Sequence, residues 1–279
     1  MLEGSKAFAK QVMVCAGVPT ARYEIITNID EIQVMVGEFE KAAVKADGLC
    51  QGKGVIICQN RSEIVGAVNR LMQDSIFGDA AKRIVVEELL EGEEASVLAF
   101  CDGKVAKLMV SAQDHKRIFD GDKGANTGGM GAYAPAPITR GMEDGIMEKV
   151  FVPVLAEMAK KGTPFKGILY AGLMINPKGK SFKVLEFNAR FGDPETQVIL
   201  PLLESDLVDV IDACIDSRLA AMDLKWKGGA ACCVVAAAAG YPEKYGKGKE
   251  IRGLDSAKGL LDVVVFHAGT KKENGKTLT

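Results

Sequence analysis

A carboxylate and an amide stand two positions apart in the segment Lys183-Val-Leu-Glu-Phe-Asn-Ala-Arg190. Side chains alternate along a strand, so Glu186 and Asn188 project from one face, about 7 Å apart, and Phe187 points into the core. Two hard oxygen ligands suit Mg²⁺, which takes few protein ligands together with water and phosphate oxygens. Arg190 continues the same face and could hold a transferring phosphoryl group. The alternative is an edge strand with a polar face.

A glycine-rich connection between two short strands could bind phosphate. In Lys45-Ala-Asp-Gly-Leu-Cys-Gln-Gly-Lys-Gly54, two lysines, Lys45 and Lys53, accompany Gly48, Gly52 and Gly54. Glycine lets backbone N–H groups approach an anion closely, and lysine supplies a point charge. The segment is not a P-loop, because its spacing is one residue short, Gly54 replaces Ser/Thr and a strand follows. A hairpin with a glycine-rich turn explains these residues equally well.

The next predicted strand ends in an acidic segment, with five carboxylates within eight residues: Glu87, Glu88, Glu91, Glu93 and Glu94. A solvated acidic edge is the ordinary explanation for such a run. The functional alternative is a nucleotide hinge, in which the backbone pairs with adenine and one carboxylate accepts hydrogen bonds from the ribose hydroxyls.

A long glycine-containing segment, residues 112–137, has no periodicity, and a loop of this length is usually functional or disordered. It contains Gln113-Asp-His-Lys-Arg117 and Asn126-Thr-Gly-Gly-Met-Gly-Ala-Tyr133. Cations, a carboxylate and an imidazole beside glycines suit a small zwitterionic or phosphorylated substrate. No G-x-S-x-G segment is present, so we do not expect a hydrolase triad.

The composition narrows the class of protein. The chain has 279 residues and a net charge of −2, which excludes a generally basic nucleic-acid binder. Its seven cysteines are odd in number and lack C-x-x-C spacing, so we expect free thiols and a cytoplasmic protein. The longest apolar run, 230–239, is too short for a bilayer, which needs about 20 residues, and is interpreted as a buried strand.

The elements that must position these residues alternate between helix and strand. We expect helices over 5–15, 30–43 (capped by Asp30), from Ser62, over 141–161, after Asp193-Pro194 and over 206–215 (capped by Ser205). Strands are expected over 42–45, 54–58, 83–87, 95–100, 104–111, 167–175 and 181–187, with two more in 229–279. Hairpins favour an α+β fold with largely antiparallel sheets.

Taken together, these segments resemble the phosphoribosylamine–glycine ligase (glycinamide ribonucleotide synthetase) family of the ATP-grasp superfamily. The resemblance rests on eight ordered blocks. They begin at Leu2, Lys45, Glu87, Gln113, Asn126, Leu169, Glu186 and Phe266. The blocks Gln-Asp-His-Lys-Arg and Asn-Thr-Gly-Gly-Met-Gly-Ala-Tyr favour this family over other ATP-grasp ligases.

The resemblance implies a role for each motif. ATP would be bound by Lys6, Lys45, Gly48, Gly52, Lys53, Gly54, Glu87, Glu88, Leu89, Leu90 and Glu94, with the lysines on the phosphates and Glu94 on the ribose. Glu186 and Asn188 would hold Mg²⁺ or Mn²⁺. Four residues would act near glycine and the acyl phosphate: Arg190, Asp193, Asp114 and Lys116. The expected substrates are glycine and 5-phosphoribosylamine, with no nucleic acid or membrane partner, and the expected assembly is a monomer or weak dimer.

The same resemblance implies the fold and its limits. Two α+β subdomains would clamp ATP within residues 1–225, with residues 20–88 as an inserted lid, and residues 226–279 would form part of a β-rich C-terminal domain. The family has a further N-terminal domain, so we expect a fragment. The wider superfamily offers a second metal carboxylate on the preceding strand, where Ala171-Gly-Leu-Met174 supplies none.

The implied reaction is ATP-dependent ligation of glycine to 5-phosphoribosylamine through glycyl phosphate, in purine biosynthesis. Phosphoryl transfer depends on positioning and charge neutralisation, which fits the absence of an obvious nucleophilic Ser or Cys. Two alternatives stay open. One is a catalytically incomplete ATP-binding module, and the other is a related ATP-grasp carboxylate–amine ligase.

Overall fold

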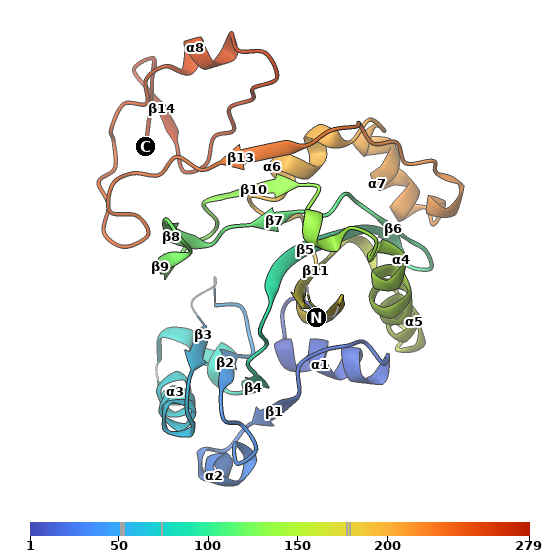
Figure 1. The fold of residues 1–279 in the computed structure, drawn as a ribbon, viewed down its shortest axis with the longest axis vertical. Coiled ribbons are helices and arrows are strands. Elements are labelled where there is room, and N and C mark those ends of the chain that lie inside the picture. The colour runs from blue at the N-terminus through green and yellow to red at the C-terminus, as the bar shows by residue number, and fades with distance from the viewer. Residues whose placement is uncertain (51–53, 74, 177, 179) are drawn as a thin grey trace.

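The computed structural model describes residues 1–50, 54–73, 75–176, 178 and 180–279. Three parts are visible in Figure 1: a small lobe at the lower left, a larger body at its right and above it, and a C-terminal segment at the top left. We refer to the small lobe, whose elements lie within residues 23–88, as the lid. Its position beside the body creates the junction at which the predicted site residues gather.

The lid is one four-stranded antiparallel sheet covered on one face by helices. Its strands lie in the order β1 (Tyr23–Ile26), β4 (Ile84–Glu88), β2 (Ala42–Ala46) and β3 (Val55–Cys58). The short helix α2 (Ile32–Met35) and the longer α3 (Arg61–Gln73) contribute to an apolar core with the inward-facing residues of the sheet. Val44 and Val86 lie in that core and are fully buried. The opposite face of the sheet is left for the junction with the body.

The body is built on a second antiparallel sheet, in the order β12 (Ser181–Asn188), β11 (Lys166–Asn176), β5 (Glu93–Asp102) and β6 (Ala106–Leu108). One face packs against α1 (Lys6–Cys15), α4 (Glu143–Ile146) and α5 (Val152–Lys160), with a π-helical turn over Met147–Phe151 between the last two. The other face packs against α6 (Thr196–Ile199) and α7 (Leu207–Ile215). The central strands β5 and β11 are therefore buried on both sides.

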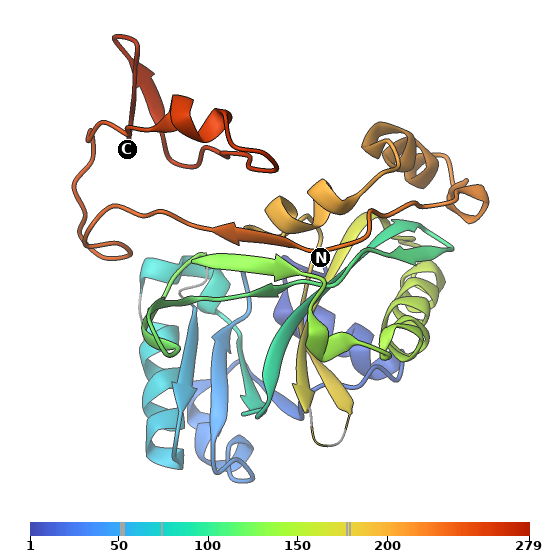
Figure 2. The ribbon, with the colours of Figure 1, turned by 45° about the horizontal axis from the view of Figure 1, so that its top comes forward.

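A third sheet joins distant parts of the chain. It contains β7 (Gln113–Asp114), β10 (Gly131–Ala134) and β13 (Ala231–Val234), with β10 in the middle. The hairpin of β8 (Arg117–Phe119) and β9 (Lys123–Asn126) extends from it. After β13 come α8 (Leu254–Lys258), β14 (Lys271–Glu273) and β15 (Lys276–Leu278), a segment that stands apart from the body in Figure 2. Five 3₁₀ turns complete the described elements: Ile29–Glu31, Ser75–Ala81, Pro137–Thr139, Leu200–Leu202 and Leu219–Ala221.

Several local predictions are confirmed. Helix α1 begins after Ser5, whose hydroxyl accepts a hydrogen bond from the Phe8 N–H at 3.1 Å. Asp102 and Gly103 form the turn between β5 and β6, and Gly103 adopts a φ of +93°, which glycine tolerates. The pairings within all of the described sheets are antiparallel, as the hairpins indicated.

Some predicted boundaries are wrong. The helix expected over 30–43 is a 3₁₀ turn and the four-residue α2, because Asn28 rather than Asp30 caps the start and the chain turns at Gly37. Asn60, not Ser62, caps α3 by accepting from the Glu63 N–H, and Asp206, not Ser205, caps α7. In each case the better-placed side-chain oxygen lies one or two residues earlier or later than predicted.

Three further expectations fail because partners distant in sequence decide the outcome. The region 112–137 contains four short strands instead of an irregular loop, since β10 pairs with β7 on one side and with β13 on the other, and β8 pairs with β9. The helix expected at Asp193-Pro194 starts only at Thr196, after Glu195, whose side chain is held by Ser96 and Tyr170. The strand within 230–239 is not buried, because β13 is an edge strand.

Among the residues that the structure describes, no helix is both long and apolar enough to cross a membrane.

Candidate functional site

The face of the lid sheet opposite its core presents two rows of side chains toward the junction. The strand registers place Lys45 beside Val55 and Val85 in one row, and Glu87 in the adjacent row with Ala43 and Ile57. Val55 and Ile57 are 39% and 48% exposed, although both belong to an apolar strand. Open apolar surface next to a lysine suits a flat base attached to a phosphate chain. Sequence analysis did not single out Val55 or Ile57, although the alternation along 55–58 was a signal for both.

Glu87 is the centre of a buried charge cluster. Its Oε2 atom lies 3.0 Å from Lys45 Nζ and 3.1 Å from Lys10 Nζ. All three side chains are at least 90% buried. Glu87 therefore presents its carboxylate to lysines rather than to a nucleotide, and any adenine contact at this position falls to its backbone. Sequence analysis missed Lys10, because a lysine in an amphipathic helix is usually on the solvated face.

Lys6 lies at the start of α1 and reaches the glycine segment of the lid. Its Nζ donates to the carbonyls of Ala46 at 2.9 Å and Gly48 at 3.0 Å. Burial lowers the pKa of Lys6, and nearby Glu186 partly opposes this shift. The ammonium is thus held at the junction, with a carboxylate of the body close enough to affect its charge.

Asp47 connects helix α1 to the lid. One carboxylate oxygen accepts from Ser5 Oγ at 2.8 Å and from the Ala7 N–H at 2.7 Å, and the other lies 2.5 Å from Arg83 Nη2. A carboxylate at the first turn of α1 also interacts favourably with the helix dipole. Asp47 therefore holds the position of Lys6 relative to Lys45.

The glycine segment is tightly packed where the structure describes it. A Cβ on Gly48 would lie 2.6 Å from Ala80 Cβ, and one on Gly54 would lie 2.6 Å from Cys50 Cβ. Both positions therefore exclude any larger residue unless the neighbour moves. Two other predicted residues of this segment, Gly52 and Lys53, lie outside the described residues.

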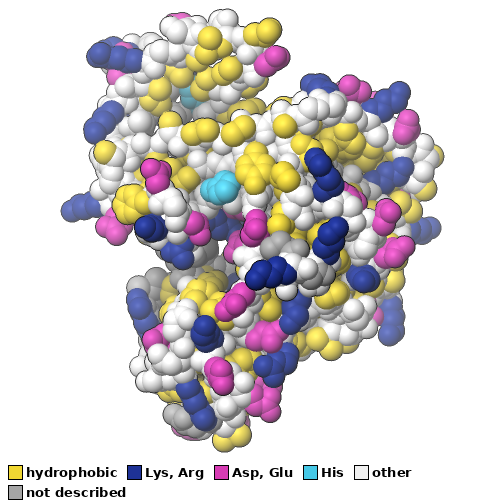
Figure 3. Space-filling view, viewed as in Figure 1, with side chains coloured by type: hydrophobic (Ala, Val, Ile, Leu, Met, Phe, Trp, Pro, Cys, Tyr) yellow, Lys and Arg dark blue, Asp and Glu magenta, His cyan; other side chains and the backbone are white. Residues whose placement is uncertain are grey.

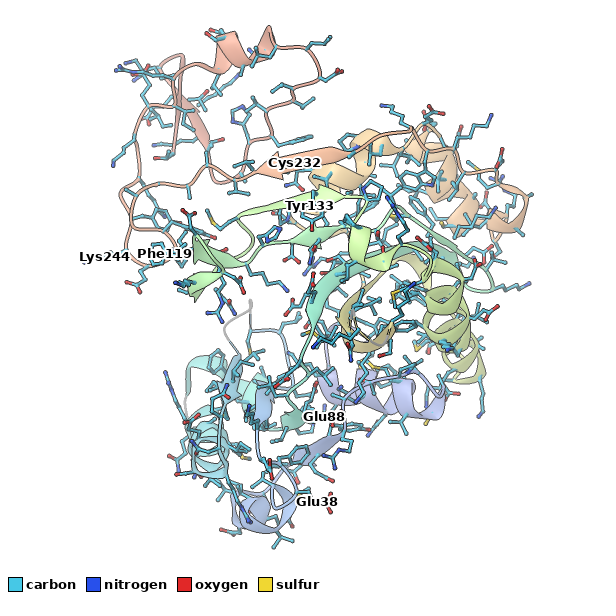
Figure 4. The ribbon with its side chains drawn as sticks, viewed as in Figure 1. Glu38, Glu88, Phe119, Tyr133, Cys232 and Lys244 are labelled. Carbon is cyan, nitrogen blue, oxygen red and sulfur yellow. The ribbon has the colours of Figure 1, made fainter. Side chains whose placement is uncertain are left out.

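The hinge after β4 joins the lid to the body through Glu88, which is labelled in Figure 4. Glu88 Oε2 lies 3.2 Å from Arg22 Nε, and Glu88 Oε1 accepts from Lys183 Nζ of β12. Burial would raise the pKa of Glu88, but the hydrogen bonds from these two cations outweigh it and lower the pKa. Leu89 and Leu90 follow, both half-buried. The Glu88 carboxylate is thus engaged in fixing the hinge.

An acidic and basic cluster lies on the body side of the junction. Lys116 Nζ lies 2.7 Å from Glu94 Oε2 and 3.7 Å from Asp114 Oδ2. Burial opposes the charge of Lys116, yet Glu94, Asp114 and Glu186 outweigh it and raise its pKa. Burial is the main cause that raises the pKa of Asp114, and Glu195 and Glu94 add to it. Figure 3 shows acidic and basic side chains intermixed along this junction.

A buried hydrogen-bonded triad lies behind this cluster. Glu195 Oε1 accepts from Ser96 Oγ at 2.8 Å and from the Tyr170 hydroxyl at 2.9 Å. Glu195 is 3% exposed and has no cation partner among the described residues. Together with Asp114 it makes this wall a favourable place for an ammonium group. Ser96, Tyr170 and Glu195 were not predicted as site residues, because no local pattern links them.

Glu186 and Asn188 lie on the same face of β12, and Phe187 is 3% exposed on the other, as predicted. Glu186 is exposed and has no hydrogen-bond or ion-pair partner within the described part of the chain. It is nevertheless near enough to Lys6 to oppose the lowering of that pKa by burial, and near enough to Lys116 to contribute to its raised pKa. This unpaired carboxylate therefore stands between the lysine of α1 and the acidic and basic cluster.

The oxygen atoms of Glu186 and Asn188 fit a hard divalent cation whose other ligands are water and phosphate oxygens. Gly172 pairs directly with Glu186 and adds no carboxylate. Across the described residues, no group of three or more His, Cys, Asp or Glu could hold a metal ion. Two oxygen ligands and open solvent match Mg²⁺, which is usually completed by water and phosphate oxygens.

Arg190 is oriented by residues of two segments. Its Nε lies 2.9 Å from Glu3 Oε1, and its Nη2 donates to Asn188 Oδ1 at 3.4 Å. Glu3 also accepts from the Ala189 N–H at 3.0 Å. Arg190 thus lies next to the Glu186 and Asn188 pair. Glu3 was not predicted to take part.

Asp193 lies at the point where the glycine loop meets the turn before α6. Its Oδ1 accepts from Gln197 Nε2 at 2.7 Å, and within the described residues it forms no bond to Asp114, Lys116 or Arg190. A Cβ on Gly129 would lie 2.4 Å from Pro194 Cδ, so the loop packs closely against this turn. The structure therefore brings Asp193 beside the loop of residues 126–131, but not into the charged cluster.

Residues of β7, β10 and β13 support this loop. His115 stacks against Tyr133 with ring centroids 5.7 Å apart. Tyr133 in turn pairs with Cys232 across the sheet, and both are labelled in Figure 4. The strand β13 thus supports the sheet from which this loop extends.

Comparison with known proteins identifies two matching family models. Residues 4–196 match the model described as phosphoribosylglycinamide synthetase, ATP-grasp (A) domain, and residues 231–279 match the C domain of the same synthetase.

Among curated proteins, the chain is 49% identical to a phosphoribosylamine–glycine ligase of Synechocystis over 281 residues, covering 100% of this chain and 65% of that protein. It is 50% identical to the trifunctional purine biosynthetic protein adenosine-3 of Gallus gallus, of which it covers 28%. A crystal structure of phosphoribosylamine–glycine ligase from Thermotoga maritima is 34% identical, with a TM-score of 0.88, covering 100% of this chain and 68% of that one. The chain therefore spans about two thirds or less of the length of these proteins.

Proposed function

The chain belongs to the phosphoribosylglycinamide synthetase family, and on that premise we propose that it acts in the ATP-dependent ligation of glycine to 5-phosphoribosylamine. The α+β ATP-grasp fold followed by part of the C domain, which the sequence led us to expect, is confirmed. The boundaries predicted for the ATP-grasp part (1–225), the lid (20–88) and the last domain (226–279) stay predictions.

One observation carries the proposal. The unpaired carboxylate of Glu186 favours the charged form of two lysines: Lys6 of α1, where it opposes the lowering of the pKa by burial, and Lys116 of the acidic and basic cluster, where it adds to the raised pKa. A cationic wall suited to a triphosphate and an acidic wall suited to an ammonium therefore meet at one carboxylate. ATP and an amino acid need such an arrangement if a carboxylate oxygen is to reach the γ-phosphorus.

In the first step, a carboxylate oxygen of glycine attacks the γ-phosphorus of ATP, and the bond to the β,γ-bridging oxygen breaks. The products are glycyl phosphate and ADP. Lys6 and Lys45 bind and neutralise the phosphates, and Arg190 holds the transferring phosphoryl group. Glu186 and Asn188 would hold Mg²⁺, which when bound neutralises the charge on the phosphate oxygens.

In the second step, the amine nitrogen of 5-phosphoribosylamine attacks the acyl carbon, the bond from that carbon to the phosphate oxygen breaks, and the nitrogen loses a proton. Glycinamide ribonucleotide and phosphate result. Asp114 and the neighbouring Glu195 orient the ammonium of glycine, which keeps its carboxylate directed at the phosphates.

The proposal is tested by ADP release from Mg·ATP, glycine and freshly generated 5-phosphoribosylamine, with each component omitted in turn. Release that requires glycine and the amine supports the ligase, whereas release that requires another amino acid supports a related carboxylate–amine ligase. ATP binding without release would indicate a catalytically incomplete module.

The Glu186→Ala variant should abolish turnover and leave the fold intact. Glu91→Gln is a matched control, because it removes an acidic side chain that is 85% exposed and 3.9 Å from Lys41 Nζ. Retained turnover in the Glu186 variant would overturn the assignment of the metal site.

A further inference from the structure

Two lysines share one carboxylate oxygen in the interior of the protein, although only one of them is needed to neutralise it. Glu87 Oε2 lies 3.1 Å from Lys10 Nζ and 3.0 Å from Lys45 Nζ. The cluster therefore holds one positive charge more than its carboxylate balances. A surplus buried charge lowers the stability of the fold, because burial penalises ions strongly. Its presence here therefore calls for a functional explanation.

The two lysines differ in what else they contact. Lys10 is 1% exposed, and its ammonium donates to Thr20 Oγ1 at 2.7 Å and lies 5.7 Å from the Tyr23 ring centroid. Lys45 has Glu87 as its one hydrogen-bond partner within the described part of the chain. Lys10 is thus fixed in place, whereas Lys45 keeps donors that no described residue uses.

Lys10 also connects the lid to the body. Thr20, which accepts a hydrogen bond from Lys10, in turn donates its hydroxyl hydrogen to the Val184 carbonyl of β12 at 2.8 Å. Glu87 belongs to β4 of the lid, and Lys10 belongs to α1 of the body. The Lys10 ammonium therefore holds Glu87 in the same place whether or not Lys45 has turned toward a ligand.

We propose that Lys10 is a positioning residue that neutralises Glu87 and so leaves the charge of Lys45 available for the phosphates of a nucleotide. Lys10 does not contact the nucleotide, and it acts through Glu87. Without it, Glu87 would bind Lys45 as its sole counterion, and the net charge of the three side chains would fall from +1 to zero. This inference rests on the proposed ATP site and adds a residue that the motifs did not include.

The test measures binding of a non-hydrolysable Mg·ATP analogue and of adenosine by calorimetry on the whole chain. Lys10→Met should weaken analogue binding about tenfold or more, because a unit charge a few ångströms away has at least that effect at an effective dielectric constant of about 20. Adenosine affinity should stay unchanged, since adenosine lacks phosphates. A merely structural role for Lys10 would weaken both ligands together.

A double variant separates charge from packing. In Lys10→Met with Glu87→Gln, the glutamine oxygen still accepts a hydrogen bond from Lys45, and the cluster regains its charge of +1. We expect the double variant to bind the analogue with an affinity within about threefold of that of the wild type. Such a value is clearly distinct from the tenfold loss expected for Lys10→Met. If Lys10→Met does not fold, the double variant is compared with the wild type alone. A tenfold loss of analogue affinity in the double variant would then overturn the inference.

Lys41→Met is the matched control, because it removes a half-exposed lysine just before β2 whose nearest carboxylate is 3.9 Å away. It should bind the analogue like the wild type. Unchanged analogue binding in Lys10→Met, or equal losses for the analogue and adenosine, would overturn the inference alone. A wild-type chain that does not bind the analogue would overturn the proposed function, and the inference with it.

Discussion

Replacement of Asp47 by alanine should loosen the contact between α1 and the lid and weaken nucleotide binding. Asp47 is 5% exposed, and its Oδ1 accepts from Ser5 Oγ and the Ala7 N–H at 2.8 and 2.7 Å. Hydrogen bonds to a charged group contribute about 1.5–3 kcal/mol each. The 2.5 Å ion pair with Arg83 adds less, because the Arg83 side chain is 50% exposed.

Together these contacts predict a loss of about 3–5 kcal/mol in the free energy of unfolding, the range found when a buried charged partner is removed. Asp47→Asn should lose roughly half as much, since its amide oxygen can still accept from Ser5 and Ala7 while its NH₂ group faces Arg83. Urea unfolding of both variants, followed by circular dichroism, measures the two losses. Asp216→Asn is the control, because Asp216 is half-exposed and its one ion-pair partner among the described residues is Arg218.

The same variants test the link between this anchor and the site. Asp47 holds the N-terminus of α1, and Lys6 on that turn donates to the Ala46 and Gly48 carbonyls. The Kd for Mg·ATP should therefore rise in the order wild type, Asp47→Asn, Asp47→Ala. An alanine variant that unfolds at the wild-type urea concentration, or one that is destabilised but binds ATP normally, would refute this reasoning.

Three other predictions concern the acidic wall and the loop beside it. Tyr170→Phe should cost about 1–2 kcal/mol of stability, measured by urea unfolding, because Glu195 loses a buried hydrogen-bond donor. Burial raises the pKa of Asp114, so the carboxylate is protonated at a higher pH than an ordinary aspartate. The KM for glycine should accordingly rise as pH falls through that raised pKa, and a pH profile that Asp114→Asn leaves unaltered would contradict this. Gly129→Ala should reduce turnover at least tenfold, because its φ is +130° and a Cβ would lie 2.4 Å from Pro194 Cδ; activity assays on the folded variant decide it.

Much of the site could be predicted from short-range patterns. Alternation along a strand was enough to place Glu186 and Asn188 on one face and Phe187 in the core. The helix that carries Lys6 followed from an apolar stripe along residues 5–15. Such predictions succeed because the physical cause lies within a few residues of its effect.

The features that failed depend on contacts between distant segments. Lys10 could be recognised as buried only when α1 was placed against β4, and Glu195 only when Ser96 and Tyr170 were brought to it. The strand β10 exists because β13 supplies a partner about a hundred residues later, with Gly131 opposite Val234. Neither composition nor periodicity contains that information.

Hydroxylamine trapping tests most directly whether this site uses ATP to activate the carboxylate of glycine, as we propose. The chain would be incubated with Mg·ATP, glycine and hydroxylamine, and glycine hydroxamate would be measured against ADP. We expect equal amounts of hydroxamate and ADP, both dependent on glycine and both lost in Glu186→Ala. ADP formed without hydroxamate, or hydroxamate formed equally well by that variant, would contradict it.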